Sequence, residues 1–400
     1  MKLRSTKTAV GNIILISLTF SVGVFNSCIK KEDHTIRLKW NKAHAADTME
    51  KNVKGLKWCL SFLGSEIAID TTLKGINYND SIIILNTSKL GFGEKAKKYL
   101  AQLNRQLKES EEYGHTKAID LGRFIALTLG SSFHYYKITG VPSNISYYQK
   151  QHDFKEGKGY INNSGVSKVN RVISFTTNSI GNEQIYISEE IEPATERLLE
   201  FETAEIMPNG FVKYGIYNTD GILKEAASNG VTRAGKPAKC IWCHESGIQS
   251  IFKEQQEQTG YLDPQVFKDV IYQNHRKLRV YQDSLWKDID IKNRRLHTLM
   301  EHAYINFMEP SVERLSREWG MPISEVEKRV GHLSKHDHEE FQYLKGLYHR
   351  KDIESLGPWK VVPVPESIRE KSDSEKDYLT LKSYFNQVLN SLSLYPSEKK

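Results

Sequence analysis

The longest apolar stretch of this 400-residue chain lies at its extreme N-terminus, and that position limits what the rest can be. The stretch covers residues 8–27 and follows the basic residues Lys2, Arg4 and Lys7. A basic start followed by a short apolar segment is the layout of a secretory signal peptide and not of a membrane-spanning helix. We therefore expect residues 1–27 to be an export signal, and we exclude a polytopic membrane protein.

The apolar stretch ends at Phe25-Asn26-Ser27-Cys28, which resembles the lipobox of bacterial lipoproteins, in which a small residue precedes a cysteine that becomes lipidated. The resemblance implies that Cys28 carries acyl chains, and more than one chain holds a protein stably at a membrane surface. Residues 28–45 would then be a lipidated polar tether. We expect an exported lipoprotein on the outer membrane, at its periplasmic face or at the cell surface. The alternatives are a plain signal peptide and an N-terminal anchor helix.

The composition of the whole chain is that of a globular protein. It is 39% hydrophobic and 26% charged, which excludes intrinsic disorder, and its length excludes a miniprotein stapled by disulfides. The formal net charge is +7, but three of the basic residues belong to the predicted signal peptide. The basic balance therefore does not argue for a nucleic-acid partner.

Hydrophobic spacing divides the remaining chain into three regions. Helical periodicity dominates residues 46–150, and β-rich runs separated by turn signals predict a small antiparallel β region over 151–235. Helical spacing returns from 236 to 400, so we expect a second helical region there. The predicted fold class is α+β, mainly α.

Individual elements can be predicted within these regions. Apolar residues recur every three or four positions from 47 to 64, which is typical of an amphipathic helix, and Cys59 borders its apolar stripe as a core thiol. Asp263-Pro264 places a cap and a first-turn proline at a helix start. The expected elements are helices at 47–64, about 93–112, about 118–129, from 264 onward and about 375–392, with hairpins of Val172–Thr177 with Gln184–Ser188 and of Phe211–Tyr217 with Ile222–Leu223.

The residues Cys240-Ile241-Trp242-Cys243-His244 form a C-x-x-C-H sequence, the attachment signature of c-type haem. Two thiols three residues apart on a helical turn reach the two vinyl groups of one porphyrin edge, and the next histidine can bind the iron. Roughly one chain in a thousand of this composition would carry such a match by chance. We therefore expect one covalent haem c on Cys240 and Cys243, with His244 as the proximal iron ligand. The helical region 236–400 would then be a helical haem-binding region.

Three other chemistries use a closely spaced cysteine pair. A zinc site needs four ligands, and the sequence has no second cysteine pair. A dithiol redox centre of thioredoxin type usually lies in a βαβ pattern, which does not surround this motif. A disulfide between Cys240 and Cys243 would close a strained loop. These alternatives stay open, and haem is favoured over them.

Segment 205–248 is similar to a group of exported monohaem cytochrome-like proteins. In that group a Met-Pro-Asn-Gly strand and an Asp-Gly hairpin precede the haem-binding turn, and here Met207-Pro208-Asn209-Gly210 and Asp220-Gly221 precede the cysteine motif. The resemblance implies that the two cysteines hold the porphyrin and that His244 binds the iron. It implies a cytochrome c-like haem site and says little about the remaining chain.

The second axial ligand of the iron separates electron transfer from other haem chemistry. A methionine opposite the histidine closes the iron, whereas an open sixth position permits ligand binding or peroxide chemistry. Met321 lies between Gly320 and Pro322, a context similar to the distal loop of small soluble cytochromes c, and Met308 is a second candidate. The other candidates are Met300, His275, His297 and His302.

Two further patterns, at residues 315–330 and 332–349, are explained by local structure without a binding function. Residues 315–330 have helix-turn-helix texture, but their charges sum to zero, so we expect a helix corner and no nucleic-acid binding. Ser334 and Asp337 are predicted to cap a helix on which His336 and His338 could not face one ion, because residues two apart diverge on a helix. We therefore expect a solvated helix start and not a metal site. The histidines of this region are His332, His336, His338 and His349.

These observations lead to one functional expectation and two alternatives. We expect a lipid-anchored exported c-type cytochrome-like protein that binds one covalent haem and exchanges electrons with an unidentified partner protein. An electron carrier is favoured over a substrate-converting enzyme. The alternatives are an open-haem enzyme of peroxidase type and a non-haem surface lipoprotein that binds zinc.

Overall fold

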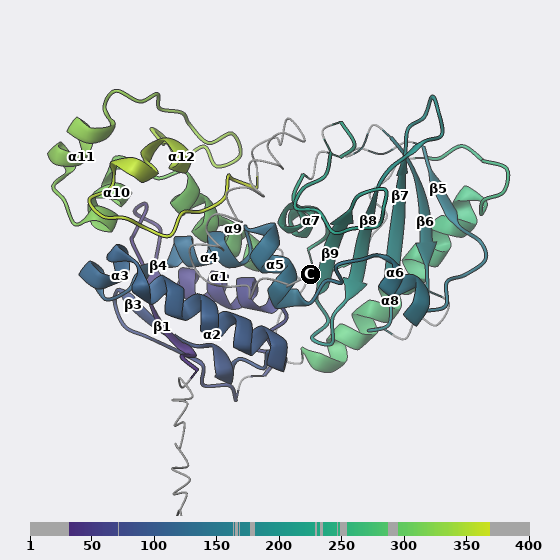
Figure 1. Ribbon diagram of the computed structural model, residues 1–400, viewed down its shortest axis with the longest axis horizontal. Coiled ribbons are helices and arrows are strands. Elements are labelled where there is room, and N and C mark those ends of the chain that lie inside the picture. Colours follow the sequence, from purple (N-terminus) through teal and green to yellow (C-terminus); the bar gives the residue numbers. More distant parts are fainter. Residues whose placement is uncertain are drawn as a thin grey trace, which may run out of the picture. The chain divides into compact units, whose positions relative to one another are not determined.

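The computed structural model describes residues 32–368, apart from 71, 163, 165–166, 168, 177–180, 229, 233–234, 246, 249–253 and 287–294 (Figure 1). The predicted signal peptide, Cys28 and the helix expected at about 375–392 lie outside the described residues, as do the side chains of Cys243 and His297. The described chain is a mixture of helices and two small sheets, so the α+β class is confirmed. None of its described helices is both long and apolar enough to cross a membrane.

A four-stranded sheet lies in the region that we expected to be helical. Its order is β2 (Ile76–Tyr78), β3 (Ile82–Asn86), β1 (Thr35–Lys39) and β4 (Ile119–Asp120), with β1 antiparallel to β3 and parallel to β4. Strand β1 falls within residues 28–45, so the tether prediction is wrong for this strand. Residues 35–39 form a strand because the apolar residues Ile36 and Leu38, which are fully buried, alternate with charged residues.

The helices of the N-terminal half confirm the predicted periodicity where it was strongest. Thr48 caps α1 by accepting a hydrogen bond from the amide of Lys51, and Cys59 on α1 is fully buried, as predicted. Helix α5 was not predicted. The bounds are α1 Met49–Phe62, the 3₁₀ helix η1 Thr87–Lys89, α2 Glu94–Glu109, α3 Glu111–Thr116, α4 Leu121–Thr128, α5 Ser132–Thr139 and α6 Ser146–Gln151.

The second sheet has five antiparallel strands in chain order. They are β5 (Gly159–Ile161), β6 (Asn170–Phe175), β7 (Ile185–Ile191), β8 (Leu198–Ile206) and β9 (Val212–Tyr217). The pairing of β6 with β7 confirms the first predicted hairpin. The second predicted hairpin is confirmed at its turn, where Tyr217 forms an antiparallel bridge with Leu223 and the amide of Lys224 donates a 2.8 Å hydrogen bond to the Ile216 carbonyl oxygen. The other edge of β9 pairs with β8 along its length. Strand β8 was not predicted.

Helices cover this sheet from two directions. Helix α8 (Pro264–Leu285) begins at the predicted Asp263 cap and runs along the sheet in Figure 1, with the Phe267 ring 6.1 Å from that of Phe175. Helix α5 lies beside the edge strand β9. The amides of Tyr214 and Ile216 on β9 donate hydrogen bonds to the tyrosine hydroxyls of α5, which satisfies polar backbone groups of this edge.

The C-terminal helices include the predicted helix corner. Helix α10 (Val312–Trp319) ends at Gly320, whose φ of 64° lies in the left-handed region, and α11 (Ile323–Val330) follows at once. The buried side chains of this corner form a separate small core, against which Met321 packs. The remaining helices are α7 Pro237–His244, α9 Arg295–Met308, α12 Arg350–Ile353 and the 3₁₀ helix η2 Glu354–Leu356.

Residues 332–349 do not form the helix that the Ser334 and Asp337 pair was expected to cap. The Asp337 carboxylate instead accepts a hydrogen bond of 3.0 Å from the amide of Gly346, which closes a loop. His336 lies in an isolated antiparallel bridge with Leu347. The prediction that His336 and His338 could not face one ion assumed a helix, so it does not apply to this loop.

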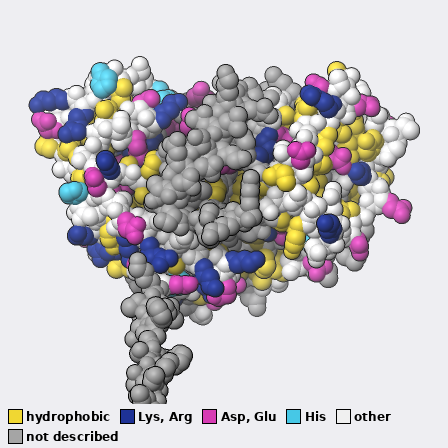
Figure 2. Space-filling model, in the orientation of Figure 1, with side chains coloured by type: hydrophobic (Ala, Val, Ile, Leu, Met, Phe, Trp, Pro, Cys, Tyr) yellow, Lys and Arg dark blue, Asp and Glu magenta, His cyan; other side chains and the backbone are white. Residues whose placement is uncertain are grey.

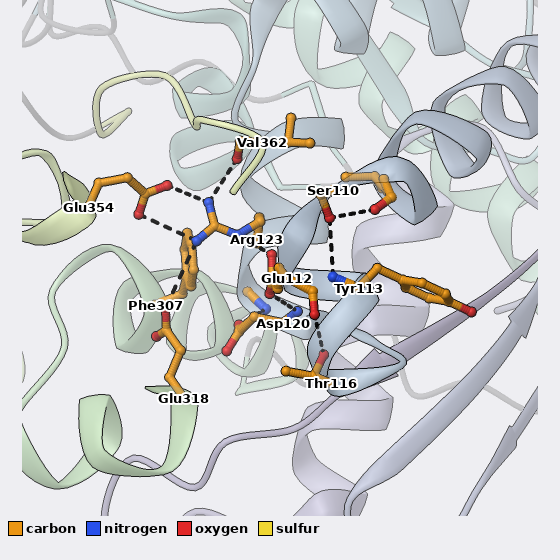
Figure 3. A network of polar contacts seen from close by, with 12 residues as sticks. Ser110, Glu112, Tyr113, Thr116, Asp120, Arg123, Phe307, Glu318, Glu354 and Val362 are labelled. Carbon is orange, nitrogen blue, oxygen red and sulfur yellow. Dashed lines mark hydrogen bonds and ion pairs between the residues drawn. The ribbon is translucent and has the colours of Figure 1, made fainter. Parts of the chain in front are cut away.

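A buried charge network lies around the ring of Phe307 on α9 (Figure 3). The guanidinium groups of Arg123, Arg314 and Arg350 lie 5.2, 5.3 and 3.9 Å from the centre of this ring. Arg350 also donates hydrogen bonds of 2.9 and 2.6 Å to the Phe307 carbonyl oxygen. The network joins α4 to α9, α10 and α12. Its carboxylates are those of Glu112, Asp120, Glu318 and Glu354.

Candidate functional site

The C-x-x-C-H sequence lies on the two-turn helix α7. Pro237 occupies its first turn, where a missing amide hydrogen costs nothing, and Ala238 and Ile241 are buried in the main core. The helix ends at His244, because Glu245 adopts a φ of 50° while its amide still donates to the Ile241 carbonyl oxygen at 2.7 Å. The local sequence therefore places the whole motif on one short, anchored helix.

Cys240 and His244 share one face of α7, since residues four apart on a helix lie one above the other. This face is turned toward β9, where the ring centre of His244 lies 5.8 Å from that of Tyr214. The Cys240 side chain is half-buried and is not part of a disulfide. The motif thus presents a thiol and an imidazole together beside the five-stranded sheet.

His244 is neutral at physiological pH. Burial, and after it the positive charge of Arg171, lowers the pKa of His244 from 6.5 to about 4. Its Nδ1 atom is buried and has no hydrogen-bond partner in the described part of the chain. A neutral imidazole with an unpartnered ring nitrogen is the form that binds a metal ion.

The sheet face near α7 carries an unusual set of buried charges. Tyr214 pairs with Ala204, so its side chain lies on the same face as Glu200 and Glu202, which precede Ala204 by four and two residues. Glu190 on β7 is directly opposite Glu200, and Arg171 on β6 is directly opposite Glu190, so both side chains lie on this same face. Sequence analysis missed these residues. The signal that could have found them is acidic residues at period two within a β-rich stretch.

The neighbouring part of α7 opens on a cavity of about 880 Å³, a size typical of ligand pockets. Lys239 and Trp242 line it from α7, and Met308 lines it from α9. The loop 332–349 contributes histidines, and Glu309 lines the cavity directly after the end of α9. Among these, His336 Nε2 lies 2.9 Å from a Glu309 carboxylate oxygen, and the rings of His336 and His349 stack 4.1 Å apart.

The structure separates the candidates for a second axial ligand. Met308 lies with Trp242 at the cavity, whereas Met321 packs in the separate core of the α10–α11 corner. His275 on α8 lies beside the residues that follow the motif, because a Cβ on Gly247 would be 3.0 Å from its ring. His302 instead contacts Phe341 and Tyr343, and Met300 is fully buried in the main core.

The histidines to which we assigned a solvated helix start lie at the cavity instead. His336, His338 and His349 all line it, since the loop that carries them folds back toward α9. The spacing His336-x-His338 could have indicated two histidines at one site, but the predicted helix excluded that interpretation. Among the described side chains, no group of three or more His, Cys, Asp or Glu is arranged to hold a metal ion.

Comparisons with known proteins add no assignment. No protein family matches the chain, and neither a curated protein nor a solved structure is detectably similar to it. The surface charges do not indicate a class of partner either, because Lys and Arg are interspersed with Asp and Glu over the described part of the face in Figure 2. The chemistry of α7 and its surroundings is therefore the basis for a function.

Proposed function

We propose that this chain is an exported, lipid-anchored c-type cytochrome-like protein that binds one covalent haem on α7 and transfers electrons. The observation that carries the proposal is the C-x-x-C-H sequence on a short anchored helix, where the buried Nδ1 of His244 has no hydrogen-bond partner among the described residues. Cys28 would carry the lipid, and the redox partner would be another protein at the same membrane.

The residues of α7 fit the group that they would hold. Cys240 and Cys243 would form thioethers to the porphyrin, His244 would bind the iron, and the haem would supply a one-electron change at that iron. The chain itself prepares the site, since burial and Arg171 keep the His244 imidazole unprotonated. The cytochrome c-like site in the C-terminal region thus stays part of the proposal.

Electron transfer is favoured by a second axial ligand that closes the iron. Met308 and His275 are the preferred candidates, because Met308 shares the cavity with Trp242 and His275 lies against Gly247. Met321 would have to leave the core of the α10–α11 corner to reach α7.

One observation favours a second function, an open-haem enzyme of peroxidase type. The cavity of about 880 Å³ beside Trp242 has room for a small ligand. The pair formed by His336 and Glu309, 2.9 Å apart, could hold and deliver a proton there. Carbon monoxide separates the two functions, because rapid binding to the reduced protein indicates an open iron, and an inert spectrum indicates a closed one.

The haem proposal predicts a covalent stain on denatured protein. Full-length chain made with a cytochrome maturation system should show peroxidase-active haem staining of its band on a denaturing gel. Replacing both Cys240 and Cys243 by Ala should remove the stain, because no thioether can form. Replacing His244 by Ala should keep the stain but change the visible spectrum of the native protein.

The matched control is Cys59→Ala, which removes a fully buried thiol on α1 and should keep the stain. An unstained wild-type band would contradict the proposal. Elemental analysis that finds zinc and no iron in the purified protein would replace it with the zinc-binding alternative.

A further inference from the structure

Three buried carboxylates share two cations on the sheet face beside α7. The carboxylates are those of Glu190, Glu200 and Glu202, and the cations are Arg171 and Lys224. Glu190 and Glu200 are fully buried, and the side chain of Glu202 is 18% exposed. A buried cluster with one excess negative charge is costly, and binding one proton removes that cost.

The contacts show where the excess carboxylate lies. Glu200 has a cation of its own, since its Oε2 lies 2.9 Å from Lys224 Nζ and accepts a 2.9 Å hydrogen bond from the amide of Ser228, while its Oε1 has no hydrogen-bond partner among the described residues. Arg171, in contrast, is divided between Glu190 at 2.9 Å and Glu202 at 3.5 Å. One guanidinium therefore serves two carboxylates.

The two carboxylates differ in how well they are held. Glu190 also accepts a hydrogen bond of 2.6 Å from the Ser188 hydroxyl, whereas Oε1 of Glu202 is buried without a partner among the described residues. Burial first, and then the charge of Glu202, raises the pKa of Glu190 to about 8. Burial also raises the pKa of Glu202. Because the two groups interact, one proton belongs to the pair.

This pair lies close to the haem-binding motif. Arg171 is within electrostatic range of both Cys240 and His244, and Tyr214, which contacts the His244 ring, is a diagonal neighbour of Glu202 across β8 and β9. The charged and titratable groups that face the pair are Arg171 on β6, Glu200 on β8, Lys224 after β9, and, beyond Arg171, Cys240 and His244 on α7.

We propose that Glu190 and Glu202 form a proton-binding site that holds one proton at neutral pH and exchanges it with water as the charge at the α7 site changes. The exchange rests on the proposed function. At a pH high enough for the oxidised protein to have released this proton to water, each electron that a one-electron donor delivers to α7 draws one proton from water back into the pair, and both leave again on oxidation. The pair would make electron transfer proton-linked.

The proton itself can be tested without haem. Infrared spectra of the full chain at pH 7 should contain the C=O band of protonated carboxyl groups, and this band should disappear on titration to high pH. Glu112 also contributes to the band, because its pKa is raised to about 7. Glu202→Gln should remove the contribution of the pair and so lower the band intensity, because Arg171 then serves Glu190 alone, and Glu190→Gln should do the same. Glu189→Gln is the matched control, since Glu189 lies on the opposite face of β7 and pairs with Lys158 at 2.8 Å.

The variants distinguish this site from other buried carboxyl groups. Circular dichroism should first establish that each variant is folded. A band of unchanged intensity in both Glu190→Gln and Glu202→Gln would overturn the proposal, and so would the absence of the band from the folded wild-type chain. The band is expected whether or not haem binds, so an unstained protein that shows it would contradict the proposed function and leave the proton site standing.

The coupling can be tested by redox titration of the haem-loaded chain at several pH values. Reduction adds negative charge, which favours the protonated pair, so the potential should fall as pH rises through the range in which the oxidised pair is deprotonated and the reduced pair is still protonated. One proton per electron corresponds to about 59 mV for each tenfold change in proton concentration. Glu202→Gln should flatten this slope and Glu189→Gln should keep it. A potential independent of pH in the wild-type protein would overturn the coupling.

Discussion

Glu318 shows how a single buried side chain can join distant parts of the chain. Its carboxylate lies 2.7 Å from an Arg350 guanidinium nitrogen and also contacts Arg314, and its side chain is 6% exposed. Burial alone would raise the pKa of Glu318, but the Arg350 and Arg314 charges outweigh burial and lower the pKa to about 2. The ion pairs therefore stabilise the charged form, and removing Glu318 leaves two arginines without this counter-charge.

We expect Glu318→Gln to destabilise the fold by about 3–5 kcal/mol, the range for breaking a buried pair on one side. Urea denaturation of the full chain should measure it. The control is Glu325→Gln, which removes an exposed pair with Lys328 and should give no measurable change. Equal stability of Glu318→Gln and the wild type would contradict this role.

The same carboxylate makes stability depend on pH in a stated direction. The pKa of Glu318 in the fold lies below its ordinary 4.5, so its contribution is fully present above about 4.5 and is lost as pH falls toward 2. Glu112 acts with the opposite sign. Its burial, only partly offset by Arg123, raises its pKa to about 7, so its contribution declines as pH rises from about 4.5 to 7.

At the scale of elements, helix α1 packs against α9 by close approach of backbones. An added Cβ on Gly55 would lie 2.6 Å from the Leu299 carbonyl oxygen, which belongs to the backbone of α9. The clash cannot be relieved by turning a side chain, so one of the helices must move. Gly55 therefore determines how near α1 lies to α9.

We expect Gly55→Ala to destabilise the fold by about 1–3 kcal/mol, although alanine favours an isolated helix. The matched control is Gly114→Ala on α3, where an added Cβ would meet nothing within 4 Å. That variant should be stabilised by about 0.4–1 kcal/mol. Thermal unfolding of both variants checks the pair of predictions, and a stabilised Gly55→Ala would refute the first.

The elements that could be predicted from the sequence have long apolar stripes and clear caps, whereas the strands that were missed are short or carry buried charges. Helices α1 and α8 have long apolar stripes with clear caps, so periodicity was sufficient to predict them. Strand β8 was missed because Glu200 and Glu202 occupy inward positions that usually carry apolar residues. Strand β1 was missed because five residues are too few to separate from a polar tether.

The candidate site shows the same division. The motif on α7 could be recognised from spacing alone, whereas the sheet face beneath it depends on strand register, which no local pattern reveals. The cavity depends on loop 332–349, where a capping pattern gave the wrong prediction. Asp337 satisfied the amide of Gly346 in place of a helix start. Tertiary contacts thus decided between two uses of one carboxylate.

At the scale of the whole molecule, the proposals join two cysteine-based attachments on one chain. Cys28 would attach the N-terminus to lipid, and the α7 pair would attach haem. Both modifications occur after export, so both proposals require the same export signal at the N-terminus. The two attachments are independent in sequence, and this independence makes them separable by substitution.

The lipid proposal predicts that Cys28→Ala moves the protein from the membrane fraction to the soluble fraction and removes labelling by radioactive fatty acid. The haem stain of the same variant should be unchanged, because the α7 cysteines are untouched. Cys59→Ala is the control and should stay at the membrane, since Cys59 is fully buried in the fold and unavailable for acylation. If Cys28→Ala stays in the membrane pellet after a wash at high pH, the anchor is the N-terminal apolar segment itself. That result would replace the lipoprotein with an uncleaved anchor helix, while leaving the haem proposal to its own test.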